Sequence, residues 1–379
     1  MDTVLEEVLN RVNGTVGDAH LNHSDPADTF PGLQLLLHFK PLFVPLYCLL
    51  VVVACVGNAF LLACILVDKK LHNATNFFIG NLAAGDLLMC LSCVPLTASY
   101  AFDTRGWAFG RPLCHLVPLL QAATVFVSVL SLTAIAVDRY VVVAHPVRRR
   151  ISLRGCGAVA VAVWALSLAL AAPPSLHTAY LDLRPAGLDL VVCEEFWHGA
   201  ERLRLIYSCL MLLTSYMIPL LSVSISYCAI TAHLRRHCLP GAPSHSQRRW
   251  DKKRRKTFSL LVVSVLAFAL CWLPLQVFNL ILDLDGDFHI VGKRYVNVLQ
   301  VSCHLVAMSS ACYNPFIYAS LHSKFRLHLR GYLRPRGRRR GSLLSQHASR
   351  HNATCLSLVS EPSAREGREV PPCSTDNSL

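Results

Sequence analysis

The amino-acid sequence predicts an all-α membrane protein, a bundle of seven transmembrane helices followed by a short amphipathic cytoplasmic helix. Of the 379 residues, 53% are hydrophobic and 16% are charged, and the mean hydropathy is +0.43, which excludes an ordinary soluble domain. The charges also leave seven long stretches that contain no charge except Asp86. Each stretch exceeds the roughly 20 residues that a helix needs to cross the hydrocarbon core. The predicted spans are about 41–67, 74–101, 112–143, 156–177, 203–234, 254–283 and 295–320.

The spans are predicted to be helices and not barrel strands. Backbone polar groups in lipid must bond within the protein, so a spanning chain is either helical or a closed barrel. Barrel strands alternate polar and apolar residues over about ten positions, whereas the stretch 49–56 is apolar throughout.

The distribution of Lys and Arg predicts the orientation. With the amino terminus outside, 27 of the 36 basic residues fall in cytoplasmic segments, as expected for short loops. The outer segments then carry a net charge of −6 and the inner segments +20. This partition predicts a multi-pass protein of the plasma membrane with an extracellular amino terminus. Its basic face is expected to contact anionic lipid and an acidic protein partner, and not nucleic acid.

Both ends of the chain are predicted to be tails. Residues 1–40 contain no basic segment followed by an apolar core, so no cleaved signal peptide is expected. Their sequons predict glycosylation at Asn13 and Asn22. Two further sequons, at Asn73 and Asn352, fall on the cytoplasmic side, where no glycosylation is expected. Segment 322–333 has apolar residues at helical spacing between basic ones and predicts the amphipathic helix, and 334–379 is predicted to be disordered.

Two of the 16 cysteines stand apart from those within the spans. Cys114 lies at the outer end of the third predicted span, and Cys193 lies in the outer loop that follows the fourth. An oxidising exterior favours a disulfide between them; the alternative is two unpaired thiols.

Asp86 is the only acidic residue inside the seven otherwise uncharged stretches, so it is predicted to lie within the membrane, where an unpaired charge costs several kcal/mol. It is therefore a candidate for binding an allosteric sodium ion, although no other cofactor is expected. The alternative is a neutral aspartic acid that holds helices together. The polar residues predicted at comparable depth are Asn58, Ser128, Ser310 and Asn314.

A series of motifs resembles the rhodopsin-like (class A) G-protein-coupled receptors. These motifs are Gly57-Asn58-Ala59-Phe60, Asn81–Asp86, Asp138-Arg139-Tyr140, Trp164, Cys271–Pro274 and Asn314–Tyr318, together with the two cysteines. The resemblance implies a heterotrimeric G protein as partner, followed by receptor kinases and arrestin. It implies roles in activation and coupling for Asp138, Arg139, Tyr140, Val147, Tyr227, Trp272, Pro274, Asn314, Pro315 and Tyr318. Unlike many relatives, this chain has only basic residues at 252–256 in place of an acid that pairs with Arg139, so elevated basal signalling is expected.

The loops resemble the peptide-binding branch that includes neuropeptide Y and RF-amide receptors. This resemblance implies that the ligand is an amidated peptide. The net charge of −6 on the outer segments would attract a cationic peptide. The predicted ligand residues are Thr97, Tyr100, Gln121, Glu195, Trp197, Tyr207, Gln276, Asn279, Asp283 and His304. Among them, Glu195 and Asp283 are expected to pair with a ligand arginine. A solvated acidic rim is the alternative for the outer acids.

The sequence argues against two other classes of protein. An ion-coupled transporter would also use an intramembrane aspartate and kinked helices, but it predicts internal repeats, and none is visible. An enzyme would need paired carboxylates, metal-ligand spacing or a phosphate loop. The sequence has none of these, so no enzyme activity is predicted.

Overall fold

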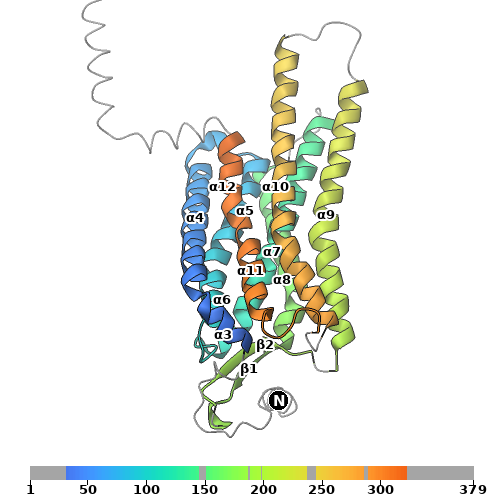
Figure 1. Cartoon of the computed structure of the whole chain (residues 1–379). Helices are drawn as coiled ribbons and strands as arrows, with labels where there is room; N and C mark the ends of the chain where they lie inside the picture. Colours follow the sequence, from blue (N-terminus) through green and yellow to red (C-terminus); the bar gives the residue numbers. More distant parts are fainter. Residues whose placement is uncertain are drawn as a thin grey trace, which may run out of the picture. The chain divides into compact units, whose positions relative to one another are not determined.

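The computed structural model describes residues 31–144, 151–186, 188–197, 199–236, 245–285 and 289–321. All of them belong to one compact unit, Met1–Phe325, and most are helical (Figure 1). Several predicted features lie outside the described residues, namely Asn13, Asn22, Val147, the amphipathic helix 322–333 and the tail 334–379.

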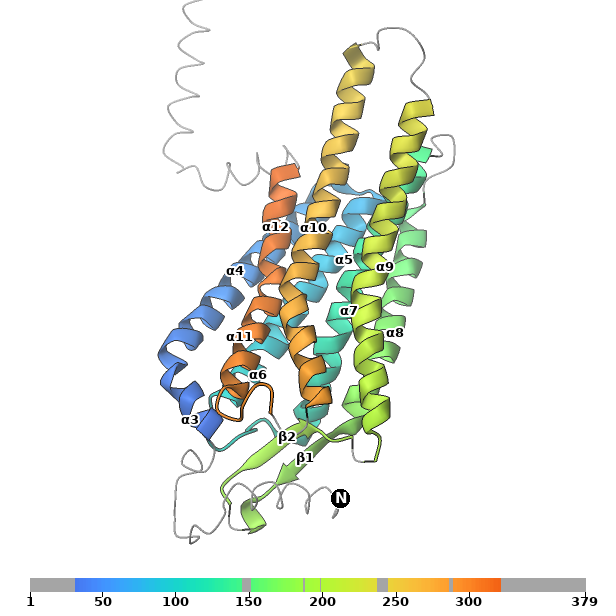
Figure 2. The same ribbon diagram turned by 45° about the vertical axis from the view of Figure 1, so that its right-hand side comes forward.

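The long helices run side by side and form a bundle (Figures 1 and 2). In chain order the helices are α3 (Pro31–His38), α4 (Lys40–Val67), η1 (Lys69–Leu71), α5 (Ala74–Leu88), η2 (Met89–Cys93), α6 (Val94–Ala101), α7 (Gly110–Ala144), α8 (Leu153–His177), η3 (Arg184–Ala186), α9 (Glu201–Arg236), α10 (His245–Leu284), α11 (Val296–Met308) and α12 (Ser310–Leu321). Helix α7 packs against α5, α8 and α9, so it occupies a central position.

Within the described residues, six helical segments are long and apolar enough to cross a membrane. One of them, Ala74–Ala101, consists of α5, the π-helical turn η2 and α6. The seventh predicted span is divided at Ser309 into α11 and α12, both of which pack against α10. Large apolar side chains on the outside of the bundle, such as Leu49, Val56 and Val161, are exposed. An apolar exterior is what lipid requires, so the fold class is confirmed as an all-α membrane protein.

Helices α4 and α12 meet closely at Pro315. Proline lacks a backbone N–H, so the Ala311 carbonyl loses its usual helical donor. Asn58 of α4 supplies a replacement, because its Nδ2 donates to the Ala311 carbonyl at 2.9 Å. Gly57 permits this approach, since a Cβ there would lie 2.9 Å from Cγ of Pro315. These four residues fix the position of α12 relative to α4.

The loop after α8 contains a hairpin that the sequence analysis did not predict. Strand β1 (Thr178–Asp182) pairs antiparallel with β2 (Val191–Glu195). The loop before α7 also bonds to β2, because Trp107 N donates to the Val191 carbonyl at 2.8 Å. Gly106 makes this possible: its φ is 78°, and a Cβ would lie 2.1 Å from the Val191 carbonyl oxygen. A disulfide joins Cys114 of α7 to Cys193 of β2, as the sequence led us to expect.

Candidate functional site

The outer ends of α9 and α10 are joined by an ion pair. Arg204 Nε lies 2.6 Å from Asp283 Oδ1, and the Ser208 hydroxyl donates to the other oxygen of the same carboxylate. The Asp283 side chain is only 4% exposed. Asp283 is one of the two acids expected to pair with a ligand arginine, but its carboxylate already has a cation of the protein, Arg204, beside it.

Glu194 and Glu195 end strand β2 beside this pair. Tyr100 of α6 donates to Glu194 at 2.9 Å, and Trp197 Nε1 donates to Glu195 at 3.2 Å. Both carboxylates keep contact with solvent, but protein atoms crowd them. This burial raises the pKa of Glu194 to about 7, with repulsion from Glu195 adding to the effect and the Tyr100 hydrogen bond and Arg204 opposing it. Burial also raises the pKa of Glu195.

Trp197, a predicted ligand residue, packs against two other rings. It stacks on His177 with ring centroids 3.8 Å apart and lies 6.2 Å from Tyr207. The indole is 4% exposed, and the Tyr207 hydroxyl donates to the Leu170 carbonyl at 3.0 Å. In this structure both residues support Glu195 and the outer end of α8.

A chain of polar side chains crosses the bundle beneath the hairpin. The Thr97 hydroxyl donates to Gln121 Oε1 at 3.3 Å, and Gln121 Nε2 lies 3.3 Å from His304 Nε2. On the other side of the imidazole, Nδ1 lies 2.9 Å from the Tyr47 hydroxyl. Thr97 and Gln121 are half-buried, whereas His304 and Tyr47 are buried. The structure therefore brings together three predicted ligand residues and adds Tyr47, which the sequence analysis missed.

The two remaining predicted ligand residues, Gln276 and Asn279, are half-buried on α10. Lower on the same helix, Trp272 is buried, and its Nε1 donates to the Ser310 hydroxyl of α12 at 3.1 Å. Pro274 lies two residues further along, within α10. Trp272, one of the predicted activation residues, is thus hydrogen-bonded to α12.

Asp86 lies in the centre of the bundle beside Asn314, whose Nδ2 donates to the carboxylate at 2.8 Å. Among the other predicted ion ligands, the two serines already have hydrogen-bond partners. Ser128 donates to the Thr124 carbonyl at 2.9 Å, and Ser310 accepts from Trp272. The side-chain oxygen of Asn58 is buried with no hydrogen-bond partner among the described residues. A carboxylate and an unsatisfied amide oxygen are hard donors that suit a sodium ion, so these residues fit the predicted ion.

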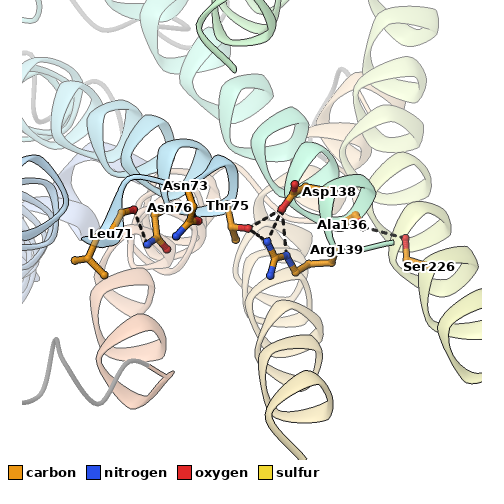
Figure 3. Close-up of polar contacts among 8 residues, drawn as sticks. All are labelled: Leu71, Asn73, Thr75, Asn76, Ala136, Asp138, Arg139 and Ser226. Atoms are coloured by element: carbon orange, nitrogen blue, oxygen red, sulfur yellow. Dashed lines mark hydrogen bonds and ion pairs between the residues drawn. The ribbon is translucent and has the colours of Figure 1, made fainter. Parts of the chain in front are cut away.

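Figure 3 shows the end of α7 where Asp138 and Arg139, two predicted activation residues, form an ion pair at 2.5 Å. Thr75 of α5 contacts both partners: its hydroxyl donates to Asp138 at 2.6 Å and accepts from Arg139. The arginine is held against α5, and Thr75 takes part in holding it.

The start of α5 is fixed just before Thr75. The Asn73 side chain accepts from the Asn76 backbone N–H at 3.0 Å, and Asn76 Nδ2 donates to the Leu71 carbonyl at 2.8 Å (Figure 3). Asn73 is therefore a helix cap, a structural role for the inner sequon. On the other side of α7, Ser226 of α9 donates to the Ala136 carbonyl at 3.3 Å.

The other predicted coupling residues are placed as follows. Tyr140 is half-buried on α7, and Tyr318 is buried on α12. Tyr227 lies on α9, but its side chain is outside the described part, as is all of Val147. Sequence reasoning missed Thr75, Tyr47 and Arg204. Each had a weak signal in the sequence. Thr75 is a hydroxyl residue at the start of the second predicted span, and Tyr47 is one in the first half of the first span. Arg204 is a basic residue among outer acids.

Comparisons with known proteins agree with this architecture. The family profile described as 7 transmembrane receptor (rhodopsin family) matches residues 57–318. Neuropeptide Y receptor type 2 of Mus musculus is 33% identical over 306 residues, covering 80% of this chain and 78% of the relative. The receptors of the same name in Homo sapiens and Gallus gallus are 32% and 33% identical over the same length and with the same coverage. The chain belongs to the rhodopsin family of seven-transmembrane receptors.

Proposed function

We propose that this receptor binds an amidated neuropeptide, prolactin-releasing peptide or a related RF-amide, and activates a heterotrimeric G protein. The observation that carries the proposal is that acidic side chains on the hairpin occur together with neutral polar side chains in the bundle. Two solvent-accessible carboxylates, Glu194 and Glu195, lie on the hairpin, and neutral polar groups of Thr97 and Gln121 lie in the bundle. A peptide end that carries an arginine and a terminal amide has matching chemistry.

The relatives support this ligand class. By their names they are receptors for neuropeptide Y, itself a peptide ligand. The loop segments Arg105–Gly110 and Cys193–Trp197 look like those of the prolactin-releasing peptide receptor, which favours an RF-amide. A receptor for another neuropeptide Y-like peptide is the second candidate. Membership of the receptor family leaves no support for a transporter.

The test is calcium and cyclic-AMP signalling in cells that express the chain on their surface. An amidated Arg-Phe peptide should act at lower concentration than its free-acid form, and Glu195→Gln should shift its response to higher concentration. Asp182→Asn is the matched control, because Asp182 is an outer acid paired with Arg184 on the hairpin. Silence toward every RF-amide with a response to a neuropeptide Y-like peptide would favour the second candidate.

On the cytoplasmic side we propose that the basic segments contact the G protein and anionic lipid, with receptor kinases and arrestin acting on the tail. The extracellular amino terminus, its two glycans and the plasma-membrane location are parts of the same proposal. They follow from the charge asymmetry of the loops.

Peptide potency is expected to fall as the pH is lowered from about 8 to 6. With a pKa of about 7, Glu194 is about nine-tenths ionised at the upper pH and one-tenth at the lower. Only the carboxylate attracts a guanidinium, so binding through Glu194 loses up to about tenfold in affinity. Radioligand competition across this pH range measures the change. Glu194→Gln should flatten the profile; an unchanged slope in that variant would exclude Glu194 as its source.

Sodium is expected to weaken agonist binding through Asp86. A cation held by Asp86 and the unsatisfied oxygen of Asn58 would add attraction between α4 and α5, and so stabilise the packing described above. Replacing about 150 mM N-methylglucamine chloride by sodium chloride should therefore lower agonist affinity several-fold. Asp86→Asn should remove the difference. Equal sodium sensitivity in that variant would exclude Asp86 as the site.

A further inference from the structure

The polar chain across the bundle has one direction of hydrogen bonding, and Tyr47 sets it. The Tyr47 hydroxyl contacts two groups, the Val301 carbonyl at 3.2 Å and His304 Nδ1 at 2.9 Å. A carbonyl can only accept, so the single hydroxyl proton is directed to Val301. The hydroxyl oxygen must then accept from His304, which places the imidazole proton on Nδ1.

The proton on Nδ1 determines the orientation of the next side chain. A neutral imidazole with Nδ1 protonated has a bare Nε2, which can only accept. Gln121 therefore presents its amide nitrogen to His304 at 3.3 Å and its amide oxygen to the Thr97 hydroxyl at 3.3 Å. The opposite tautomer would place two donors face to face and would require the Gln121 amide to turn over.

This orientation matters because Thr97 and Gln121 keep exposed surface, whereas His304 and Tyr47 are buried behind them. As observed, the side of Gln121 near Thr97 carries an oxygen, which can accept from the N–H of a peptide amide. Turned over, the same side would carry an N–H, which suits a free carboxylate. The buried pair thus controls whether the exposed pair accepts or donates.

We propose that Tyr47 is a positioning residue that, through the tautomer of His304 and the orientation of Gln121, gives the receptor its preference for an amidated over a free-acid peptide end. This inference rests on the proposed function, because it takes the carboxy-terminal group of a peptide as the occupant of the Thr97–Gln121 position. Tyr47 itself does not contact the ligand.

The test compares the two forms of one Arg-Phe peptide on the wild type and on Tyr47→Phe. The variant keeps the ring and loses the hydroxyl, so both tautomers of His304 become accessible. The amide should lose about five- to tenfold in potency, as expected for one buried hydrogen bond, while the free acid keeps or gains potency. The ratio between the two peptides therefore shrinks. A merely structural role for Tyr47 would weaken both peptides equally, and that result would overturn the proposal.

Tyr216→Phe is the matched control. Tyr216 is also buried, at 8% exposure, and its hydroxyl donates to a helix carbonyl, that of Ala269, at 3.1 Å. Loss of this hydroxyl removes a similar bond elsewhere in the bundle, so the ratio of amide to acid potency should stay at the wild-type value. A ratio that shrinks as much as in Tyr47→Phe would overturn the proposal.

A second measurement does not depend on the ligand. Nitrogen-15 NMR of the receptor labelled at histidine reports which ring nitrogen carries the proton, and the His304 signal is identified by its loss in His304→Gln. We expect a proton on Nδ1 in the wild type and a mixture or Nε2 protonation in Tyr47→Phe. The same tautomer in both proteins would overturn the inference. Failure of the wild type to respond to any amidated peptide would reject the proposed function and leave the NMR result to decide the role of Tyr47.

Discussion

Replacing both Cys114 and Cys193 by serine is expected to lower peptide potency by roughly 30- to 1,000-fold. The disulfide links residues 79 apart and holds strand β2 against the outer end of α7. Loss of a disulfide that closes a long loop costs about 2–4 kcal/mol, and each 1.4 kcal/mol corresponds to tenfold in affinity. This cost falls on ligand binding because Glu194 and Glu195 directly follow Cys193, so a released hairpin must be reordered when the peptide binds.

The measurement is ligand binding to receptors counted at the cell surface, since the variant is also expected to reach the surface less well. Cys303→Ser is the control, because Cys303 is a half-buried thiol of α11 with no disulfide. Wild-type affinity in the double variant, at equal surface density, would mean that the backbone bonds of Val191 to the loop before α7 hold the hairpin without the disulfide.

Thr75→Val is expected to raise signalling in the absence of ligand. The Thr75 hydroxyl bonds to both Asp138 and Arg139, and valine has the same shape without that group. Hydrogen bonds to charged groups contribute about 1.5–3 kcal/mol, so the equilibrium should shift about 10- to 100-fold toward a state in which Arg139 is released to the G protein. The effect should be large in this chain, since residues 252–256 offer no acid as a second partner for the arginine.

Basal cyclic-AMP or inositol phosphate accumulation per surface receptor measures this shift. Thr75→Ser keeps the hydroxyl and should behave as the wild type. Thr133→Val is a matched control, because its hydroxyl donates to the Val129 carbonyl of its own helix at 2.9 Å. If Thr75→Ser raised basal signalling as much as Thr75→Val, the methyl packing of Thr75 and not its hydroxyl would be responsible.

The sequence predicted the membrane class, the order of the spans, and the partners of Asp86 and of the two disulfide-bonded cysteines. Asp86 and Asn314 were proposed as neighbours because an intramembrane carboxylate needs a polar partner, and they are 2.8 Å apart. The disulfide followed from two cysteines on the oxidising side. In each case the chemistry of one residue type, a carboxylate in lipid or a thiol in an oxidising compartment, strongly favours a partner, so the residue can be recognised from the sequence alone.

Pairings at the two ends of the bundle could not be predicted in this way. Asp283 was assigned to the ligand and Arg204 was given no role, although the two residues form an ion pair. The outer loops are polar and irregular, and their charges can pair in many ways at similar cost. The hairpin was missed for a related reason, because its strands are only five residues long and alternate weakly.

What the sequence by itself determined is therefore the fold class and the family, because lipid makes length, hydropathy and charge placement decisive. The tertiary structure decided which side chains meet. Tyr47 and His304 are 257 residues apart, and Thr75 and Arg139 are 64 apart. Their contacts depend on the rotation and depth of each helix. Helices that are apolar on every face carry no periodic pattern from which that rotation can be read, so it is set by packing details such as the approach of Gly57 to Pro315.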